Sequence, residues 1–73
     1  MRKRYFREED VLRFISDAAD AEGIWEGDDE TLATVFRVPE YEAYAVLGDL
    51  CDRNHLQRLE SSKYIITGWK EQG

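Results

Sequence analysis

The sequence has one cysteine and one histidine, Cys51 and His55, whose thiol and imidazole could form a nucleophilic pair. A Cys–His pair needs a third group to orient the imidazole, and these two residues lie four apart across an expected helix end with no such group beside them. One Cys and one His also leave a tetrahedral metal site short of its usual ligands. Gly23 and Gly27 flank a Trp and lack the spacing of a phosphate-binding loop. We therefore predict a protein that is not an enzyme, with no cofactor, metal or small-molecule substrate.

A more informative set of residues lies just after position 40. Tyr41, Tyr44, Ala45 and Gly48 follow the i, i+3, i+4, i+7 spacing that places residues on one face of a helix. Tyr offers a large area with a polar tip, and Gly permits close backbone approach, so this face suits contact with another protein or a second copy of the chain. The alternative is that one or both tyrosines pack onto the first helix or onto the strand that contains Trp25.

Basic residues suggest a second function, the binding of duplex DNA. Nucleic-acid-binding proteins lay basic N-terminal arms along phosphates or into a minor groove, although a solubilising terminus is the plain alternative. The net charge of −6 opposes nucleic acid at long range. The residues that would make these contacts are Arg2, Lys3, Arg4, Arg7, Tyr41, Tyr44, Arg58 and Lys63.

Acidic residues dominate the stretch from 17 to 30, which holds seven carboxylates and no basic residue. A solvated surface together with a helix start explains such a stretch. A third and less favoured function is mimicry of DNA charge, in which a basic partner protein would bind the acidic groups. That function would use Asp28, Asp29, Glu30, Glu40 and Glu42.

Length and composition predict one domain over residues 1–73, with a flexible basic arm at 1–6 and a short tail at 69–73. A single cysteine forms no internal disulfide, which fits a reducing compartment. No apolar run approaches the roughly 18–20 residues of a membrane span. The charged residues 7–10 stand where a secretory signal would be apolar. These features predict a cytoplasmic protein without membrane contact.

The elements that must position these residues are three helices and a small sheet, so the predicted class is α+β. Apolar periodicity predicts helices over about 8–21, 30–36 and 40–53, with Gly23 ending the first and Pro39 in the first turn of the third. Asp28 or Asp29 caps the second helix, and Asn54 adopts the left-handed conformation after the third. Residues 24–25 form a short edge strand, and 55–59 with 63–67 form a hairpin, giving a two- to three-stranded antiparallel sheet. Tyr5 or Phe6 folds back onto the core, and Trp69 either plugs the core or extends the contact surface.

The order helix, strand, helix, helix, strand, strand resembles the winged helix-turn-helix superfamily over roughly residues 8–68. The segment "TLATVFRVPEYEAYAVLGDLCDRNHLQRL" is similar to the family's small helix, apolar turn, second helix and polar break, and "KYIITGWK" is similar to its closing strand. Residues at the family's core and turn positions are Leu32, Ala33, Val38, Ala43, Leu47, Leu50, Asn54 and Leu56.

The resemblance implies that the third helix is a recognition helix and that residues 60–63 form the wing. Family recognition helices usually expose Ser, Thr, Arg, Gln or Lys near their start, where this chain has Glu40, Tyr41, Glu42, Tyr44 and Ala45. This departure shifts the expected function from DNA toward protein contact. We therefore expect a homodimer or an adaptor in a transcription or nucleic-acid-associated assembly, with DNA binding as the alternative.

Overall fold

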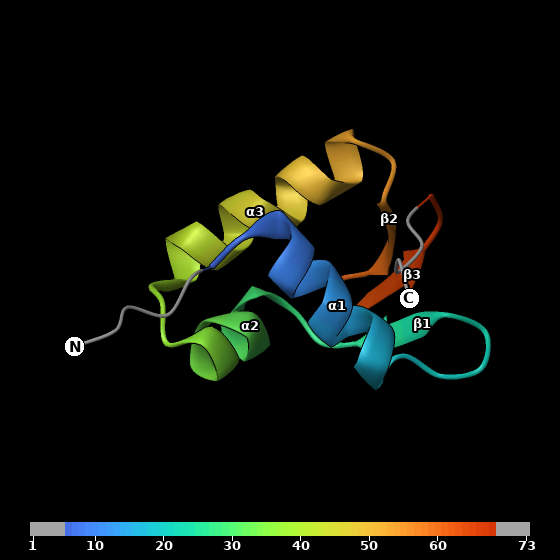
Figure 1. Cartoon of the computed structure of the whole chain (residues 1–73), viewed down its shortest axis with the longest axis horizontal. Helices are drawn as coiled ribbons and strands as arrows, with labels where there is room; N and C mark the ends of the chain where they lie inside the picture. Colours follow the sequence, from blue (N-terminus) through green and yellow to red (C-terminus); the bar gives the residue numbers. More distant parts are fainter. Residues whose placement is uncertain (1–5, 69–73) are drawn as a thin grey trace.

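Three helices and a three-stranded antiparallel sheet make up the computed structural model, which describes residues 6–68. Figure 1 shows the sheet at the end of the molecule where α1 and α3 both finish. The α+β class and the predicted element order are confirmed. Arg2, Lys3, Arg4, Tyr5 and Trp69 lie outside the described residues. The elements are α1 (Glu8–Ala18), β1 (Ile24–Glu26), α2 (Asp29–Phe36), α3 (Glu40–Asp52), β2 (Leu56–Glu60) and β3 (Lys63–Ile66).

The end of α1 differs from the prediction because local side-chain bonding competes with the helix. Ala19 is already extended, with ψ 157°. The Asp20 carboxylate accepts hydrogen bonds from the backbone N–H groups of Glu22 (2.9 Å) and Ile24 (3.0 Å), which holds a turn in place of another helical turn. Gly23 lies in this turn with φ +84°, so the expectation that Gly23 ends the helix is wrong. The turn sends the chain directly into β1.

The connection between α2 and α3 is short and well defined. Asp28 caps α2 by accepting a hydrogen bond from the backbone N–H of Thr31 at 3.1 Å. Of the two aspartates predicted as candidates, the cap is therefore Asp28. Arg37 ends the helix in the left-handed conformation, with φ 59° and ψ 48°. Pro39 is extended and precedes α3 as its N-cap, one position before the predicted first turn. Asn54 is left-handed after α3, with φ 64°, as predicted.

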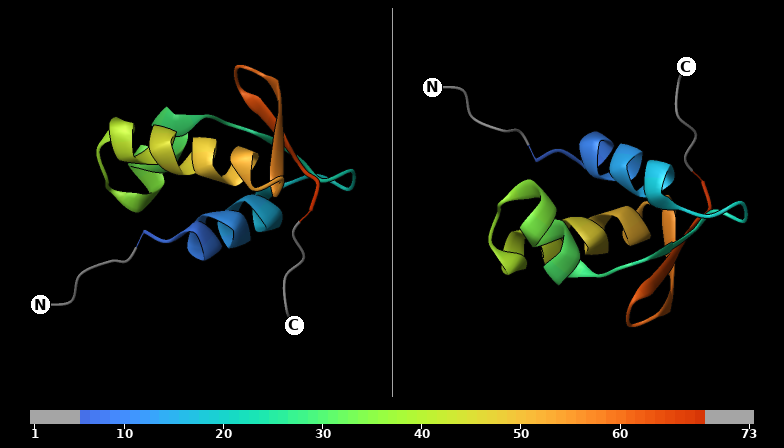
Figure 2. Two further views of the ribbon diagram at one scale, coloured as in Figure 1. Left: turned by 90° about the horizontal axis from the view of Figure 1, so that it is seen from above. Right: turned by 90° about the horizontal axis from the view of Figure 1, so that it is seen from below.

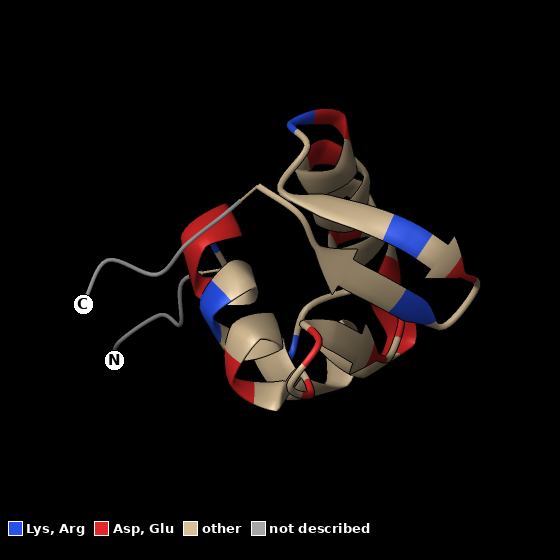
Figure 3. Ribbon diagram, turned by 90° about the vertical axis from the view of Figure 1, so that its right-hand side faces the viewer, with Lys and Arg blue, Asp and Glu red and all other residues tan. Residues whose placement is uncertain are grey.

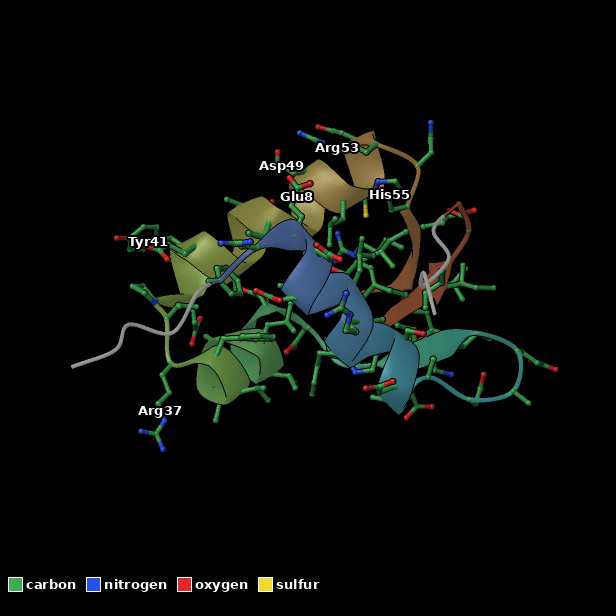
Figure 4. The ribbon with its side chains drawn as sticks, in the orientation of Figure 1. Glu8, Arg37, Tyr41, Asp49, Arg53 and His55 are labelled. Atoms are coloured by element: carbon green, nitrogen blue, oxygen red, sulfur yellow. The ribbon has the colours of Figure 1, made fainter. Side chains whose placement is uncertain are left out.

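Replacement of Arg37 by glycine is expected to raise the free energy of unfolding by about 0.5–1 kcal/mol. The left-handed conformation costs a residue with a Cβ about 1–2 kcal/mol, and glycine avoids this cost. Glycine also has more conformational freedom in the unfolded chain, which cancels only part of the gain in stability. The Arg37 side chain points away from the body of the molecule (Figure 4), so its removal breaks no packing. Urea unfolding followed by circular dichroism measures the change. Arg37→Ala is the control: it should show no gain, and a gain equal to that of glycine would contradict the backbone explanation.

The central strand of the sheet is β3, which pairs with β1 on one side and β2 on the other. Tyr64 on β3 stands opposite Trp25 on β1 and opposite Arg58 on β2. The β2–β3 ladder shifts register between Arg58 and Glu60, which is a bulge. A bulge strengthens the local twist and interrupts the free edge, which discourages another chain from adding to β2.

The core lies between the helices and the inner face of this sheet. Trp25 is its largest member and packs against Phe14 and Tyr64, with ring centroids 6.1 and 6.0 Å apart. Phe6 folds back onto Phe36, with centroids 5.2 Å apart, as one of the two predicted aromatics was expected to do. The buried apolar side chains are Val11, Leu12, Ile15, Trp25, Leu32, Phe36, Ala43, Leu47, Leu50, Leu56 and Tyr64.

Helix α3 is flanked differently on its two sides. In both views of Figure 2, α1 runs along one side of α3 and the β2–β3 hairpin projects on the other. On the α1 side, the Arg53 guanidinium Nε lies 3.5 Å from a carboxylate oxygen of Glu8. The remaining outward face of α3 is therefore bounded by a helix on one side and by the hairpin on the other.

Candidate functional site

The outer face of α3 carries the four residues that the helical spacing singles out. Tyr41 and Tyr44 are 72% and 69% exposed, and Ala45 and Gly48 are exposed beside them. Tyr41 points away from the other helices in Figure 4. The alternative that these tyrosines pack onto α1 or Trp25 is therefore wrong. We call these four residues the tyrosine face.

The core explains why the tyrosine face is left outside. Ala43, Leu47 and Leu50 occupy the opposite side of α3 and are at most 3% exposed. A helix of 13 residues that turns this stripe inward must turn Tyr41 and Tyr44 outward, because the two stripes differ by more than a right angle on the helical wheel. Two exposed tyrosines on one face are the kind of apolar feature that marks contact sites.

A groove borders the tyrosine face where α3 meets the β2–β3 hairpin. It has a volume of about 360 Å³. Both α3 and the hairpin contribute residues to its walls. Two of these residues, Asp52 and Tyr64, were not predicted from the sequence as part of a site. Asp52 had a signal, because it lies eleven positions after Tyr41 on the same helical stripe. The lining includes Tyr44, Leu47, Gly48 and Asp52 from α3 with Arg58 and Tyr64 from the hairpin.

Carboxylates surround the tyrosine face. Glu40 and Glu42 stand in the first turn of α3, where they also favour the positive end of the helix dipole. Asp49 and Asp52 stand near its end, where the dipole gives carboxylates no such benefit. Within residues 6–68 none of these four groups forms an ion pair. The face is thus aromatic at its centre and acidic at both ends.

Among the residues predicted for DNA contact that lie within 6–68, Arg58 and Lys63 line different surfaces. Arg58 lines the groove beside Tyr44. Lys63, in contrast, faces Glu26 across the β1–β3 ladder, with 3.8 Å between the ammonium and the carboxylate. Figure 3 shows basic bands on both strands of the hairpin, with acidic bands on the helices around them. Arg7 is exposed at the start of α1, and the remaining basic residues of the arm lie outside the described part.

The acidic residues considered for DNA mimicry are also divided. Asp28 is occupied as the cap of α2, where its carboxylate also accepts from the Thr31 hydroxyl at 3.3 Å. Asp29 and Glu30 belong to the first turn of α2, whereas Glu40 and Glu42 belong to α3. A helix cap and two helix starts account for these carboxylates locally.

Cys51 and His55 lie half-buried at the end of α3. Burial, and then the charge of Asp52, raise the pKa of the Cys51 thiol, and these effects outweigh the opposing influence of Arg58. The thiol is therefore protonated and weakly nucleophilic at neutral pH. Nδ1 of His55 is buried without a hydrogen-bond partner among the described residues, so it forms no hydrogen bond with the thiol. Burial also raises the pKa of the Tyr64 hydroxyl, so this groove residue is neutral over a wider pH range than an exposed tyrosine.

Three further findings concern partners and relatives. Among residues 6–68 no group of three or more His, Cys, Asp or Glu side chains is placed to hold a metal ion. None of the helices in that range combines the length and apolar character of a membrane span. No family model matches the chain, and no curated protein or solved structure does so.

Proposed function

We propose that this chain is a winged-helix module that acts by binding another protein through the tyrosine face of α3. The single observation that carries this proposal is the exposure of Tyr41 and Tyr44 on one face, at 72% and 69%. Tyr is among the residues most enriched at energetically dominant interface positions. Burial of roughly 100 Å² of each ring would contribute about 2.5 kcal/mol per residue before the costs of association.

The arrangement of the elements supports the winged-helix part of the proposal. The order α1-β1-α2-α3-β2-β3, with β3 between β1 and β2, agrees with the pattern that the sequence resembles. In that arrangement α3 is the recognition helix and the turn between β2 and β3 is the wing. The face that a recognition helix offers to a partner is here the tyrosine face.

The charges on α3 favour a protein over duplex DNA as that partner. A surface that binds DNA must approach a phosphate backbone, and each carboxylate near that backbone opposes the approach. Glu40 and Glu42 stand at the start of α3, and Asp49 and Asp52 stand near its end. Within residues 6–68, Arg58 is the only basic residue that lines the adjoining groove. A protein partner meets the aromatic area without that electrostatic cost.

Substitution of Tyr44 by glutamate is expected to weaken association by about tenfold or more, because it places a charge at a position that loses water on binding. Light scattering measures self-association, and retention of proteins from cell extract on the immobilised chain measures binding of a different partner. Circular dichroism should be unchanged, because Tyr44 is exposed.

Ala21→Glu is the matched control, since it adds the same charge in the exposed turn between α1 and β1. The control should associate like the natural chain. Equal association of the Tyr44→Glu variant would contradict the proposal. So would chemical-shift changes along α3 and the hairpin on titration with duplex DNA at low salt, because they would assign the same face to nucleic acid.

A further inference from the structure

The groove between α3 and the hairpin has features that select its occupant. Leu47 and the ring of Tyr64 are its most buried lining residues, and Tyr44 forms part of its wall. Gly48 leaves the α3 side open, because a side chain there would meet nothing within 4 Å. The groove is therefore continuous with the tyrosine face and accessible to the side chains of another molecule.

The basic side chains near the groove have interaction partners within the domain, whereas the carboxylates that line it have no ion-pair partner among residues 6–68. Arg58 directs its Nε toward the backbone carbonyl of Glu60, at 3.4 Å, along its own strand. Arg53 is engaged with Glu8 of α1, which runs along the side of α3 away from the hairpin (Figure 2). Asp49 and Asp52 line the groove and have no ion-pair partner among residues 6–68. Two carboxylates thus border an aromatic groove that holds one basic side chain.

This combination suits a guanidinium group. Arginine stacks its planar group on an aromatic ring and donates paired hydrogen bonds to a carboxylate, and its long stem covers apolar surface. A second copy of the chain fits less well. Its own tyrosine face is bordered by Glu40, Glu42, Asp49 and Asp52, so two such faces would bring like charges together.

We propose that the groove docks a basic segment of a partner protein, with an Arg side chain of that segment placed between Tyr44 and Asp52. This inference rests on the proposed function, because the groove adjoins the tyrosine face, and it adds the chemical class of the partner. The segment carries apolar residues for the exposed rings of Tyr41 and Tyr44, together with Arg for the carboxylates.

The test uses two synthetic peptides with capped ends, one with alternating Leu and Arg and the other with citrulline in place of each Arg. Citrulline keeps the shape of arginine and lacks its charge. The isotope-labelled full chain is titrated with each peptide and followed by NMR. We expect the Arg peptide to shift the backbone amides of Gly48, Asp52 and Arg58, and the citrulline peptide to bind about fivefold or more weakly.

Two variants locate the site. Asp52→Asn keeps the size of the side chain and removes its charge, so it should weaken the Arg peptide by about three- to fivefold. Asp17→Asn removes an exposed carboxylate from α1 and should leave binding unchanged. Equal binding of the two peptides overturns the proposal. Shifts confined to the acidic stretch 20–30 overturn it as well.

The failure of this inference can be told from failure of the proposed function. If neither peptide shifts the groove amides and Tyr44→Glu still weakens association, the basic occupant is wrong and the interface on α3 stands. If the groove amides shift with protein concentration alone, the occupant is a second copy. If Tyr44→Glu also has no effect on association, both proposals fall.

Discussion

Replacement of Trp25 by alanine is expected to lower the free energy of unfolding by about 3–5 kcal/mol, which is the range for removing a large buried aromatic side chain. A domain of this size has little stability in reserve, so much of the variant population should be unfolded at room temperature. Trp25 is 3% exposed and joins two layers, since its ring contacts Phe14 on α1 and Tyr64 on β3. Its loss removes contacts on both sides of the core at once.

Urea unfolding followed by far-ultraviolet circular dichroism measures this effect. Tyr41→Ala is the matched control, because it removes an aromatic side chain that is 72% exposed. The control should change the free energy of unfolding by no more than about 0.5 kcal/mol, as surface substitutions usually do. Similar losses in the two variants would show that Trp25 is not a central core residue.

The second large effect is expected at Gly27, where alanine should lower the free energy of unfolding by about 1–3 kcal/mol. A Cβ at this position would clash with Cζ2 of the Trp25 ring. The ring is rigid and enclosed, so either Trp25 or the backbone must move. Gly27 also donates its backbone N–H to the carbonyl of Ser62 at 2.8 Å, which limits how far the backbone can shift.

A double-mutant comparison isolates this clash. In a Trp25→Leu background the added methyl group has space, so the further cost of Gly27→Ala should be much smaller than in the natural chain. Gly48→Ala is the opposite control: its Cβ meets nothing within 4 Å, and alanine in a helix interior is favoured over glycine by about 1 kcal/mol. An equal cost of Gly27→Ala in both backgrounds would assign the effect to the backbone and not to the ring.

The parts of the fold that follow from local chemistry could be predicted from the sequence. The i, i+3, i+4 stripes identified all three helices, and Asn54 and Asp28 marked a helix end and a helix start. The end of α1 was placed wrongly because Asp20 offers its carboxylate to two backbone N–H groups, which outweighs continued helix. Short side-chain-to-backbone bonds of this kind leave no periodic signal.

The candidate site also has one part that the sequence predicted and one part that it did not. Helical spacing alone grouped Tyr41, Tyr44, Ala45 and Gly48 on one face, and the structure exposes all four. Residue spacing could not show whether Arg58 and Lys63, which were both predicted to contact DNA, lie on the same surface. These residues lie on paired strands on either side of a bulge, and they line different surfaces of the domain.

The sequence by itself determined that α3 has an apolar inner stripe and an aromatic, acid-bordered outer face, because both follow from a fixed rotation per residue along one helix. Only the tertiary structure decided that this face continues into a groove. The groove needs the hairpin to stand beside α3, and that position depends on core packing between Leu47, Leu56 and Tyr64, which belong to three different elements. Contacts between elements distant in the chain are set by the shapes that pack together, and no local pattern records them.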